Sequence, residues 1–302
     1  MMPAPLEHLV PVPGPLPLAQ TLQIPRYVLG DPTQRRDAVG VLKATWTAEG
    51  AATVRFVAER EGIRVTAWGA GAGAAVGEAP AWLGLHDDPS GFEPREAVLR
   101  ELWRRFAGLR IGRTGRVWEA LAPHVVAQKV SGADAARSWQ DLVRRYGEPA
   151  PGPERLRMPP RPERIAALGY AELHLCGLEQ RRASTLIRAA REMPRLEAAM
   201  RQRPEQAQRR LEALRGIGLW TVAKVVGEAR GDADVVPLGD YNLPSVVAWA
   251  LAGERRATDA RMLELLEPYR GHRARVVRLL EAGHVSPPRR GPRREILDFR
   301  RR

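Results

Sequence analysis

Two glycines and one aspartate are the residues of this chain whose types and spacing could do chemistry. Gly216 and Gly218 lie one residue apart between two helix-favouring stretches, 206–214 and 219–230. A tight glycine turn that opens a helix presents backbone N–H groups, and those groups together with the helix dipole attract phosphate. Asp240 comes next, after a Pro-Leu-Gly turn at an expected helix start. The stretch therefore predicts a phosphate-binding turn followed by one placed carboxylate.

The elements that must position these residues are of two kinds. Up to about residue 90, β-favouring residues alternate at 44–47, 51–58 and 63–68, and 59–62 fits a hairpin turn. From residue 92 onward the apolar residues recur with helical spacing. Besides the two around the glycines, helices are expected at 96–106, 118–130, 134–146, 164–168, 179–192, 243–251 and 260–266. The fold class is therefore α+β, with a small N-terminal antiparallel-sheet domain followed by an all-helical core.

The composition favours a polyanionic partner and excludes several other classes of protein. The 302 residues carry a formal net charge of +13, which favours nucleic acid, although an arginine-rich proteome would give the same balance. Cys176 is the one cysteine, so neither an internal disulfide nor a Cys-rich metal site can form. No stretch reaches the roughly 18 to 20 apolar residues of a membrane span. The N-terminus lacks the basic start of a signal peptide, so none is expected.

The glycine turn and the aspartate together resemble the helix-hairpin-helix (HhH-GPD) DNA glycosylases, closest to the branch that includes bacterial 3-methyladenine DNA glycosylase II. In that family the hairpin reads roughly Leu-x-Gly-Ile-Gly-x-Trp-Thr-Ala, and the catalytic aspartate follows in a Pro-x-x-Asp-Tyr context. This chain has Leu214-Arg-Gly216-Ile217-Gly218-Leu-Trp220-Thr221-Val222, then Pro237-Leu-Gly-Asp240-Tyr241. The resemblance implies a catalytic Asp240. It also implies DNA contacts by the hairpin residues Gly216, Ile217, Gly218 and Thr221.

The resemblance also suggests how the chain divides. In the alkylation-repair branch a small α+β domain precedes the helical core, and the turn cluster at Asp87 and Asp88 is the expected boundary. Beside proline and glycine, these two acids are expected to cap a helix or close a turn rather than to do chemistry. The expected parts are an extended Pro-rich lead-in at 1–20, a small α+β sheet domain at 21–91, a helical core at 92–285 with the active-site cleft between two subdomains, and a basic tail at 286–302.

A second motif, at residues 126–131, resembles the family's Gln-Gln-(Val/Ile)-Ser/Thr element, which enters the minor groove beside the extruded base. The match implies DNA contacts for Gln128, Lys129 and Ser131. Lys129 replaces the residue that would fill the gap left by the flipped base. A role as filler, a phosphate contact and an ordinary solvated lysine all stay open.

Basic residues elsewhere suggest further phosphate contacts, with a solvated surface as the alternative. Arg113 lies in a run of arginines without an intervening acid, and the tail is also arginine-rich. The run consists of Arg104, Arg105, Arg110, Arg113 and Arg116.

Four residues are expected at the base pocket from the resemblance. Trp220 and Tyr241 match positions whose aromatic faces stack on a flipped base, with core packing as the alternative. Lys224 falls where close relatives carry a third aromatic residue, and Leu279 aligns near another. A lysine in the pocket would repel a cationic base, which leaves room for neutral lesions such as hypoxanthine or oxidised purines. The same lysine could instead turn to phosphate.

The implied reaction is hydrolysis of an N-glycosidic bond in double-stranded DNA. The base must first be extruded from the duplex. Asp240, ionised, would then stabilise oxocarbenium-like charge on the sugar and orient a water. Members that also cut the strand carry a lysine immediately before the hairpin threonine, where this chain has Trp220. The prediction is thus a monofunctional DNA glycosylase of base excision repair that acts on alkylated purines, and Lys224 is the amine that could overturn it.

No metal and no organic cofactor is required by this chemistry. In the family a monovalent cation often bridges hairpin carbonyls to phosphate, and the matching carbonyls lie near Leu214 and Gly216. One alternative is the same fold acting on oxidised or deaminated purines, with or without lyase activity. An alternative from another class is a non-catalytic hairpin protein that only binds DNA. We expect a cytoplasmic, nucleoid-associated monomer.

Overall fold

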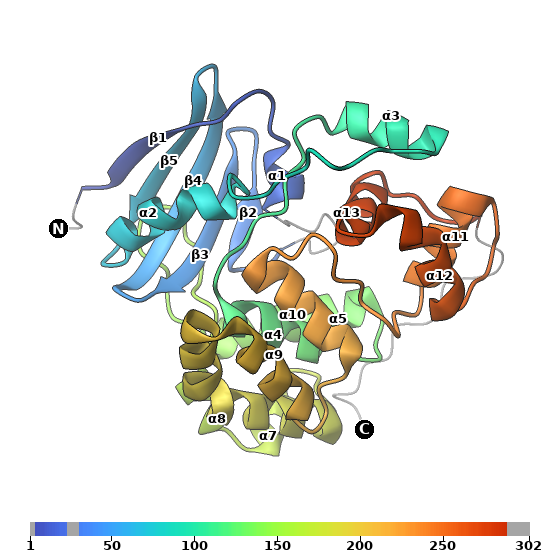
Figure 1. Cartoon of the computed structure of the whole chain (residues 1–302). Coiled ribbons are helices and arrows are strands. Elements are labelled where there is room, and N and C mark those ends of the chain that lie inside the picture. Colours follow the sequence, from blue (N-terminus) through green and yellow to red (C-terminus); the bar gives the residue numbers. More distant parts are fainter. Residues whose placement is uncertain (1–3, 23–29, 289–302) are drawn as a thin grey trace.

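The structure is a computed structural model that describes residues 4–22 and 30–288 (Figure 1). A β-sheet formed by the N-terminal part of the chain stands beside a larger helical region (Figure 1). The predicted α+β class, with a small antiparallel sheet ahead of a helical core, is confirmed. Among the described helices, none is long and apolar enough to cross a membrane.

The elements of the described residues follow one another in two groups. The sheet domain holds β1 (Leu6–Pro11), α1 (Leu18–Thr21), β2 (Gln34–Arg36), β3 (Val41–Thr47), β4 (Gly50–Glu59), β5 (Gly62–Trp68) and α2 (Ala72–Trp82). The helical region holds α3 (Ala97–Arg105), α4 (Val117–Val126), α5 (Gly132–Tyr146), α6 (Pro162–Ala166), α7 (Tyr170–His174), α8 (Gln180–Gln202), α9 (Pro204–Ala213), α10 (Leu219–Arg230), α11 (Leu243–Ala252), α12 (Asp259–Leu266), the 3-10 helix η1 (Glu267–Tyr269) and α13 (Arg273–Ala282).

The sheet is antiparallel in the order β1-β5-β4-β3-β2. The three strands expected at 44–47, 51–58 and 63–68 are present as β3, β4 and β5, and Glu59 pairs with Gly62 across the expected hairpin. Alternating side chains bury one face of the sheet against α2. The other face is covered from the helical region, where Leu156 and Met158 pack on Leu42. Burial on both faces ties the sheet to the helical region.

The Pro-rich lead-in is part of the sheet. β1 pairs with β5 over its whole length, and Val10 is buried in the sheet core. Proline lacks a backbone N–H donor, but an edge strand bonds on one side only and therefore accepts proline, here Pro11 at its end. The sheet domain therefore begins at β1 rather than at residue 21.

Two hydrophobic cores divide the helices. One is formed by α4 to α10 and includes Leu121 and Val225. The other joins α3 to the C-terminal helices and includes Leu99 and Leu280. After α3 the chain leaves the second core and enters the first, and after α10 it returns to the second core. Asp240 lies at the point of return, just ahead of α11.

An ion pair holds the junction between sheet domain and helices to α13. The carboxylate of Asp87 bonds the Arg275 guanidinium at 2.7 and 2.9 Å, and one of its oxygens also accepts from the N–H of Ile111 at 2.9 Å. Arg275 and Asp87 have side chains only 0% and 4% exposed. Asp87 does close a turn, as predicted, since its N–H donates to the Gly84 carbonyl at 3.0 Å, but its carboxylate also neutralises a buried arginine, which was not predicted. Asp88 does close a turn, since it accepts from the N–H of Ser90 at 2.9 Å.

Candidate active site

The two hairpin glycines have different physical roles. Gly216 has φ +96°, and a Cβ there would stand 2.3 Å from the Thr185 hydroxyl, so the turn between α9 and α10 requires glycine. Gly218 has an ordinary φ of −106° and precedes the first residue of α10, and a Cβ added there would meet no atom within 4 Å. The surface around the start of α10 is therefore open, as a phosphate-binding helix start must be.

Gln128 braces this hairpin. Its Nε2 donates to the Gly216 carbonyl and to the Thr221 hydroxyl, both at 3.0 Å. The loop that carries it begins where α4 ends, and the buried Arg182 holds that end by donating to the Val126 carbonyl at 2.6 Å. Gln128 thus acts within the protein, on the same hairpin whose backbone is expected at phosphate.

Lys129 is exposed and has a φ of +57°, in the left-handed region that side-chain-bearing residues rarely adopt. The helix predicted to reach residue 130 ends at Val126 for this reason. Two positions further on, the Ser131 hydroxyl accepts from the Asp134 N–H at 3.1 Å and so caps α5. Lys129 is therefore exposed to solvent between Gln128, which is held by the hairpin, and the start of α5.

Asp240 is held by three hydrogen bonds. One carboxylate oxygen, Oδ2, accepts from Trp220 Nε1 at 2.7 Å. The other, Oδ1, accepts from the backbone N–H groups of Asn242 and Leu243 at 2.9 and 3.0 Å, at the start of α11. Together these three donors fix the orientation of the carboxylate. The aspartate therefore caps α11 and also faces the hairpin helix.

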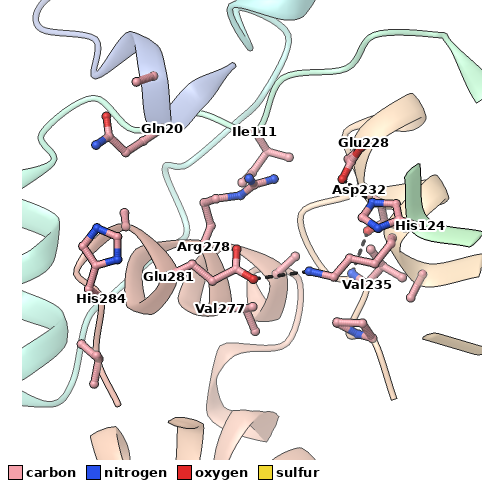
Figure 2. A pocket seen from close by; sticks show the side chains of 18 of the residues that line it. Gln20, Ile111, His124, Glu228, Asp232, Val235, Val277, Arg278, Glu281 and His284 are labelled. Carbon is pink, nitrogen blue, oxygen red and sulfur yellow. Dashed lines mark hydrogen bonds and ion pairs between the residues drawn. The ribbon is translucent and has the colours of Figure 1, made fainter. Parts of the chain in front are cut away.

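A cavity of about 420 Å³ lies against this carboxylate. Trp220, Lys224 and Glu228 reach it from α10, spaced by one helical turn each, and Asp240 and Glu281 reach it from the other helical core. A second cavity of about 480 Å³, shown in Figure 2, adjoins it and lies between α10 and α13. The side chains common to both linings are His124, Lys224, Glu228 and Glu281.

One ion pair and one histidine–carboxylate hydrogen bond line both cavities. Lys224 Nζ lies 3.3 Å from Glu281 Oε1, and His124 Nε2 lies 2.7 Å from Glu228 Oε1 (Figure 2). The His124 ring also meets the Trp220 ring edge-on, with centroids 5.5 Å apart. These four side chains form one charged surface of the cavities, called the charged wall below. It starts beside Trp220, which donates to Asp240.

Both glutamates of this wall have a pKa below the ordinary value. Burial raises the pKa of the Glu228 carboxyl, but the charges of His124, Lys224 and Arg278 together lower it more. Partial desolvation likewise raises the pKa of Glu281, whose side chain is 45% exposed, and the charges of Lys224 and Arg278 outweigh that effect. The wall therefore carries two ionised carboxylates at neutral pH.

Tyr241 and Leu279, both expected at the base pocket, lie elsewhere. The side chain of Tyr241 is 90% exposed on the surface beside Asp240. Leu279 is fully buried in the core of the C-terminal helices. Residues two apart on a helix point about 200° apart, so Glu281 faces the cavity and Leu279 turns away from it. The expectation that these two side chains line the pocket does not fit their positions.

The remaining predicted DNA contacts divide into buried and exposed groups. Ile217 and Thr221 have buried side chains, so only their backbone could meet a phosphate. Arg113 is exposed, whereas Arg116 pairs with Glu78 and Arg110 donates to the Asp87 carbonyl at 3.4 Å. The tail at 286–302 lies almost wholly outside the described residues.

The hairpin carbonyls offered for a cation already accept hydrogen bonds. The Leu214 carbonyl accepts from the Ile217 N–H at 2.9 Å, and the Gly216 carbonyl accepts from Gln128. Each carbonyl oxygen has a second lone pair, so a monovalent cation at this turn stays a prediction. Within the described residues, no cluster of His, Cys, Asp and Glu has the arrangement of a metal site.

Comparisons with known proteins identify a family over part of the chain and a shared fold. The sequence profile of the HhH-GPD superfamily of base excision DNA repair proteins matches residues 124–270. That range contains the hairpin, its Gln128 brace and Asp240. This part of the chain belongs to the HhH-GPD superfamily. YfjP of Bacillus subtilis (strain 168), named as a candidate DNA-3-methyladenine glycosylase, is 25% identical over 153 residues. The match covers 49% of this chain and 52% of YfjP, so the chain spans about half the length of this curated relative.

Solved HhH-GPD structures share the fold. The Archaeoglobus fulgidus 3-methyladenine DNA glycosylase aligns with a TM-score of 0.76 and 21% identity, over 92% of this chain and 97% of that one. The Clostridium acetobutylicum 8-oxoguanine glycosylase/lyase, solved with double-stranded DNA, aligns with a TM-score of 0.64 and 12% identity, over 88% and 90%. The sheet domain is included in both alignments, because each covers most of the chain.

His124, Glu228 and Glu281 are the site residues that sequence reasoning missed. His124 and Glu228 are far apart in the chain and belong to no motif, so only the packing of α4 on α10 brings them together. A weak signal did exist for Glu228, which follows Lys224 by one helical turn on the same face of the hairpin helix.

Proposed function

We propose that this protein is a monofunctional DNA glycosylase of base excision repair, which flips an alkylated purine out of duplex DNA and hydrolyses its N-glycosidic bond. The observation that carries the proposal is the placement of Asp240. Its carboxylate stands at a cavity, is oriented by Trp220 and α11, and lies one helix away from the open hairpin turn. A duplex held at the hairpin could therefore deliver an extruded nucleotide to the acid.

In the proposed reaction the bond from C1′ to the base nitrogen breaks, and the base leaves with the electron pair. The ionised Asp240 stabilises the positive charge that develops on the sugar. A water adds its oxygen to C1′ and gives up a proton, which leaves an abasic site. Trp220 is a positioning residue here, since its N–H fixes the carboxylate oxygen that faces α10.

An alkylated, cationic purine is compatible with the charges of the cavity. Lys224 alone would repel such a base, but Glu281 pairs with it. Glu228 and Asp240 add further negative charge to the lining. A positively charged base therefore meets more carboxylate than ammonium, which favours alkylated purines over the neutral lesions that Lys224 suggested.

Hydrolysis without strand cleavage is proposed because Trp220 occupies the position of the Schiff-base lysine. Lys224 is the amine to test, because it lines the same cavity as Asp240. Its Nζ lies 3.3 Å from Glu281 Oε1, so the amine is already engaged by a carboxylate of the cavity. Incubation with substrate and borohydride should therefore trap no covalent protein–DNA adduct. An adduct that disappears in Lys224→Ala would show lyase chemistry instead.

The decisive experiment measures base release from duplexes that contain 3-methyladenine, 7-methylguanine, 1,N6-ethenoadenine, hypoxanthine or 8-oxoguanine, with alkali to cleave the abasic sites. Asp240→Asn keeps the shape and the cap of α11 but removes the charge, so release should fall about 100- to 1,000-fold while DNA binding persists. Glu264→Gln on α12, an exposed carboxylate-to-amide change, is the matched control. Release that is unchanged in Asp240→Asn would remove Asp240 from the mechanism. DNA binding without release from any duplex would favour the non-catalytic alternative.

A further inference from the structure

The four side chains of the charged wall and the neighbouring Arg278 form a cluster of five side chains from three helices behind Asp240. His124 comes from α4, Lys224 and Glu228 from α10, and Arg278 and Glu281 from α13 (Figure 2). The two glutamates are both influenced by Arg278 and Lys224, so the five groups act on one another as a single cluster. None of them lies in the glycine turn at 214–218 or in the aspartate turn at 237–241.

Stability alone is a weak reason for such a cluster. The Lys224 and Glu281 side chains are 24% and 45% exposed, and partly exposed ion pairs contribute little to folding. An apolar lining would cost less desolvation than charged groups at the same positions. A charged lining is useful where a polar ligand must be recognised, because ionised acceptors form stronger hydrogen bonds than neutral ones.

Glu228 is the member best placed to recognise a base. Only one of its oxygens, Oε1, is engaged by His124, and a carboxylate has about four acceptor positions. It lines both cavities and lies two helical turns along α10 from Trp220, which donates to Asp240. A base whose sugar stands at Asp240 would extend along this face of α10 toward the carboxylate.

We propose that Glu228 is a specificity-determining residue, whose carboxylate accepts hydrogen bonds from the N–H groups of the extruded base. The site therefore selects purine lesions that present N–H donors on the edge turned toward α10. This inference rests on the proposed glycosylase function. His124 is a positioning residue, since it holds one oxygen of Glu228 and packs against Trp220.

The lesions themselves supply the contrast needed for a test. On its Watson–Crick edge, 7-methylguanine has N1–H and N2–H donors that match a carboxylate. The etheno ring of 1,N6-ethenoadenine removes the exocyclic N–H donors from the same edge. A site that pairs with substrate donors discriminates strongly against analogues that lack them, because the buried acceptor is then left unpaired.

The experiment measures single-turnover base release by the full chain from duplexes with 7-methylguanine and with 1,N6-ethenoadenine, and takes the ratio of the two rates. In Glu228→Gln the ratio should fall about 10- to 100-fold, the value of a hydrogen bond to a charged acceptor. Glu228→Asp, which keeps the charge on a shorter side chain, should retain a larger share of the ratio. Glu264→Gln should leave it unchanged.

Several outcomes would overturn the proposal. Equal loss of both activities in a folded Glu228→Gln would assign the residue to the structure of the site. The melting temperature and the affinity for an abasic-site duplex show whether the variant is misfolded. If Glu228→Gln is misfolded, the ratio of the two rates in Glu228→Asp is used instead. A ratio equal to that of the wild type in a folded variant overturns the role of Glu228. A wild-type protein that releases only 1,N6-ethenoadenine also overturns it while leaving the glycosylase function intact. Failure to release any damaged base would overturn both proposals.

Discussion

Helix α13 carries two ion pairs of similar composition in very different surroundings. Arg275 pairs with Asp87 through two short bonds, and their side chains are 0% and 4% exposed. Glu281 pairs with Lys224 at 3.3 Å, with side chains 45% and 24% exposed. The first pair is desolvated and cannot be broken without leaving a buried charge, whereas water can replace either partner of the second.

This difference in solvent exposure separates a pair that maintains the fold from a pair that belongs to the candidate site. The Arg275 pair joins the C-terminal helices to the junction after the sheet domain and so fixes the position of α13. The Glu281 pair lies at the far end of that helix, where α13 meets the cavity. Changes at the first pair should therefore alter the free energy of unfolding, and changes around the second should alter base release while the protein stays folded.

The largest effect is expected for Asp87→Asn. The change leaves the Arg275 charge buried without a counter-ion, which should lower the free energy of unfolding by about 3–5 kcal/mol. Denaturant unfolding followed by circular dichroism measures this loss. Asp88→Asn, next in the chain but in an exposed turn, is the matched control and should change stability far less. Similar losses in the two variants would contradict the framework role of Asp87.

Trp220→Phe should act on the site instead. Phenylalanine keeps most of the ring but loses the N–H that donates to Asp240 at 2.7 Å. The loss of a hydrogen bond to a charged group should raise the barrier to base release by about 1.5–3 kcal/mol, or roughly 10- to 150-fold in rate. Single-turnover kinetics at saturating enzyme measure the rate. A rate equal to that of the wild type would leave base stacking as the role of Trp220.

The hairpin glycines provide a smaller contrast of the same kind. Gly216→Ala forces a side chain into a backbone of φ +96° and against Thr185, so stability should fall by about 1–2 kcal/mol or more. Gly218→Ala meets open space and should change stability by less than about 0.5 kcal/mol. Its methyl group stands where phosphate is expected to approach, so affinity for duplex DNA should fall. Fluorescence anisotropy with labelled DNA measures this affinity. An unchanged affinity in Gly218→Ala would argue against the hairpin as a phosphate site.

The smallest effect concerns acid pH. Because the pKa of Glu228 is lowered in the folded protein, its ionised form stabilises the fold above the ordinary pKa of 4.5, and the stabilisation is lost as pH falls through the lowered value. The wild type should exceed Glu228→Gln in stability by under about 1 kcal/mol at pH 7. The difference should shrink below pH 4.5 in thermal melts over a pH series. A difference that grows toward acid pH would contradict the ionised state of Glu228.

Sequence reasoning is most accurate where local rules dominate. The second hairpin helix is predicted at 219–230 and observed as Leu219–Arg230, because Gly218 opens it and Gly231 ends it in the left-handed conformation. The alternating strands on either side of the turn at 59–62 are also observed. Local reasoning does not recognise β1, since its strand character depends on pairing with β5 more than fifty residues later. It also misses the Arg275 partner of Asp87, because a turn residue and the partner of a buried arginine have the same local sequence.

By itself, the sequence determined the hairpin, the aspartate that follows it and the family of residues 124–270. These features depend on glycine backbone freedom, helix periodicity and spacing within one continuous stretch. Only the tertiary structure decided that Trp220 donates to Asp240, that Leu279 and Tyr241 lie away from the cavity, and that Glu281 neutralises Lys224. The reason is physical: α4, α10 and α13 are distant in the chain, and the packing of two hydrophobic cores determines which of their faces meet.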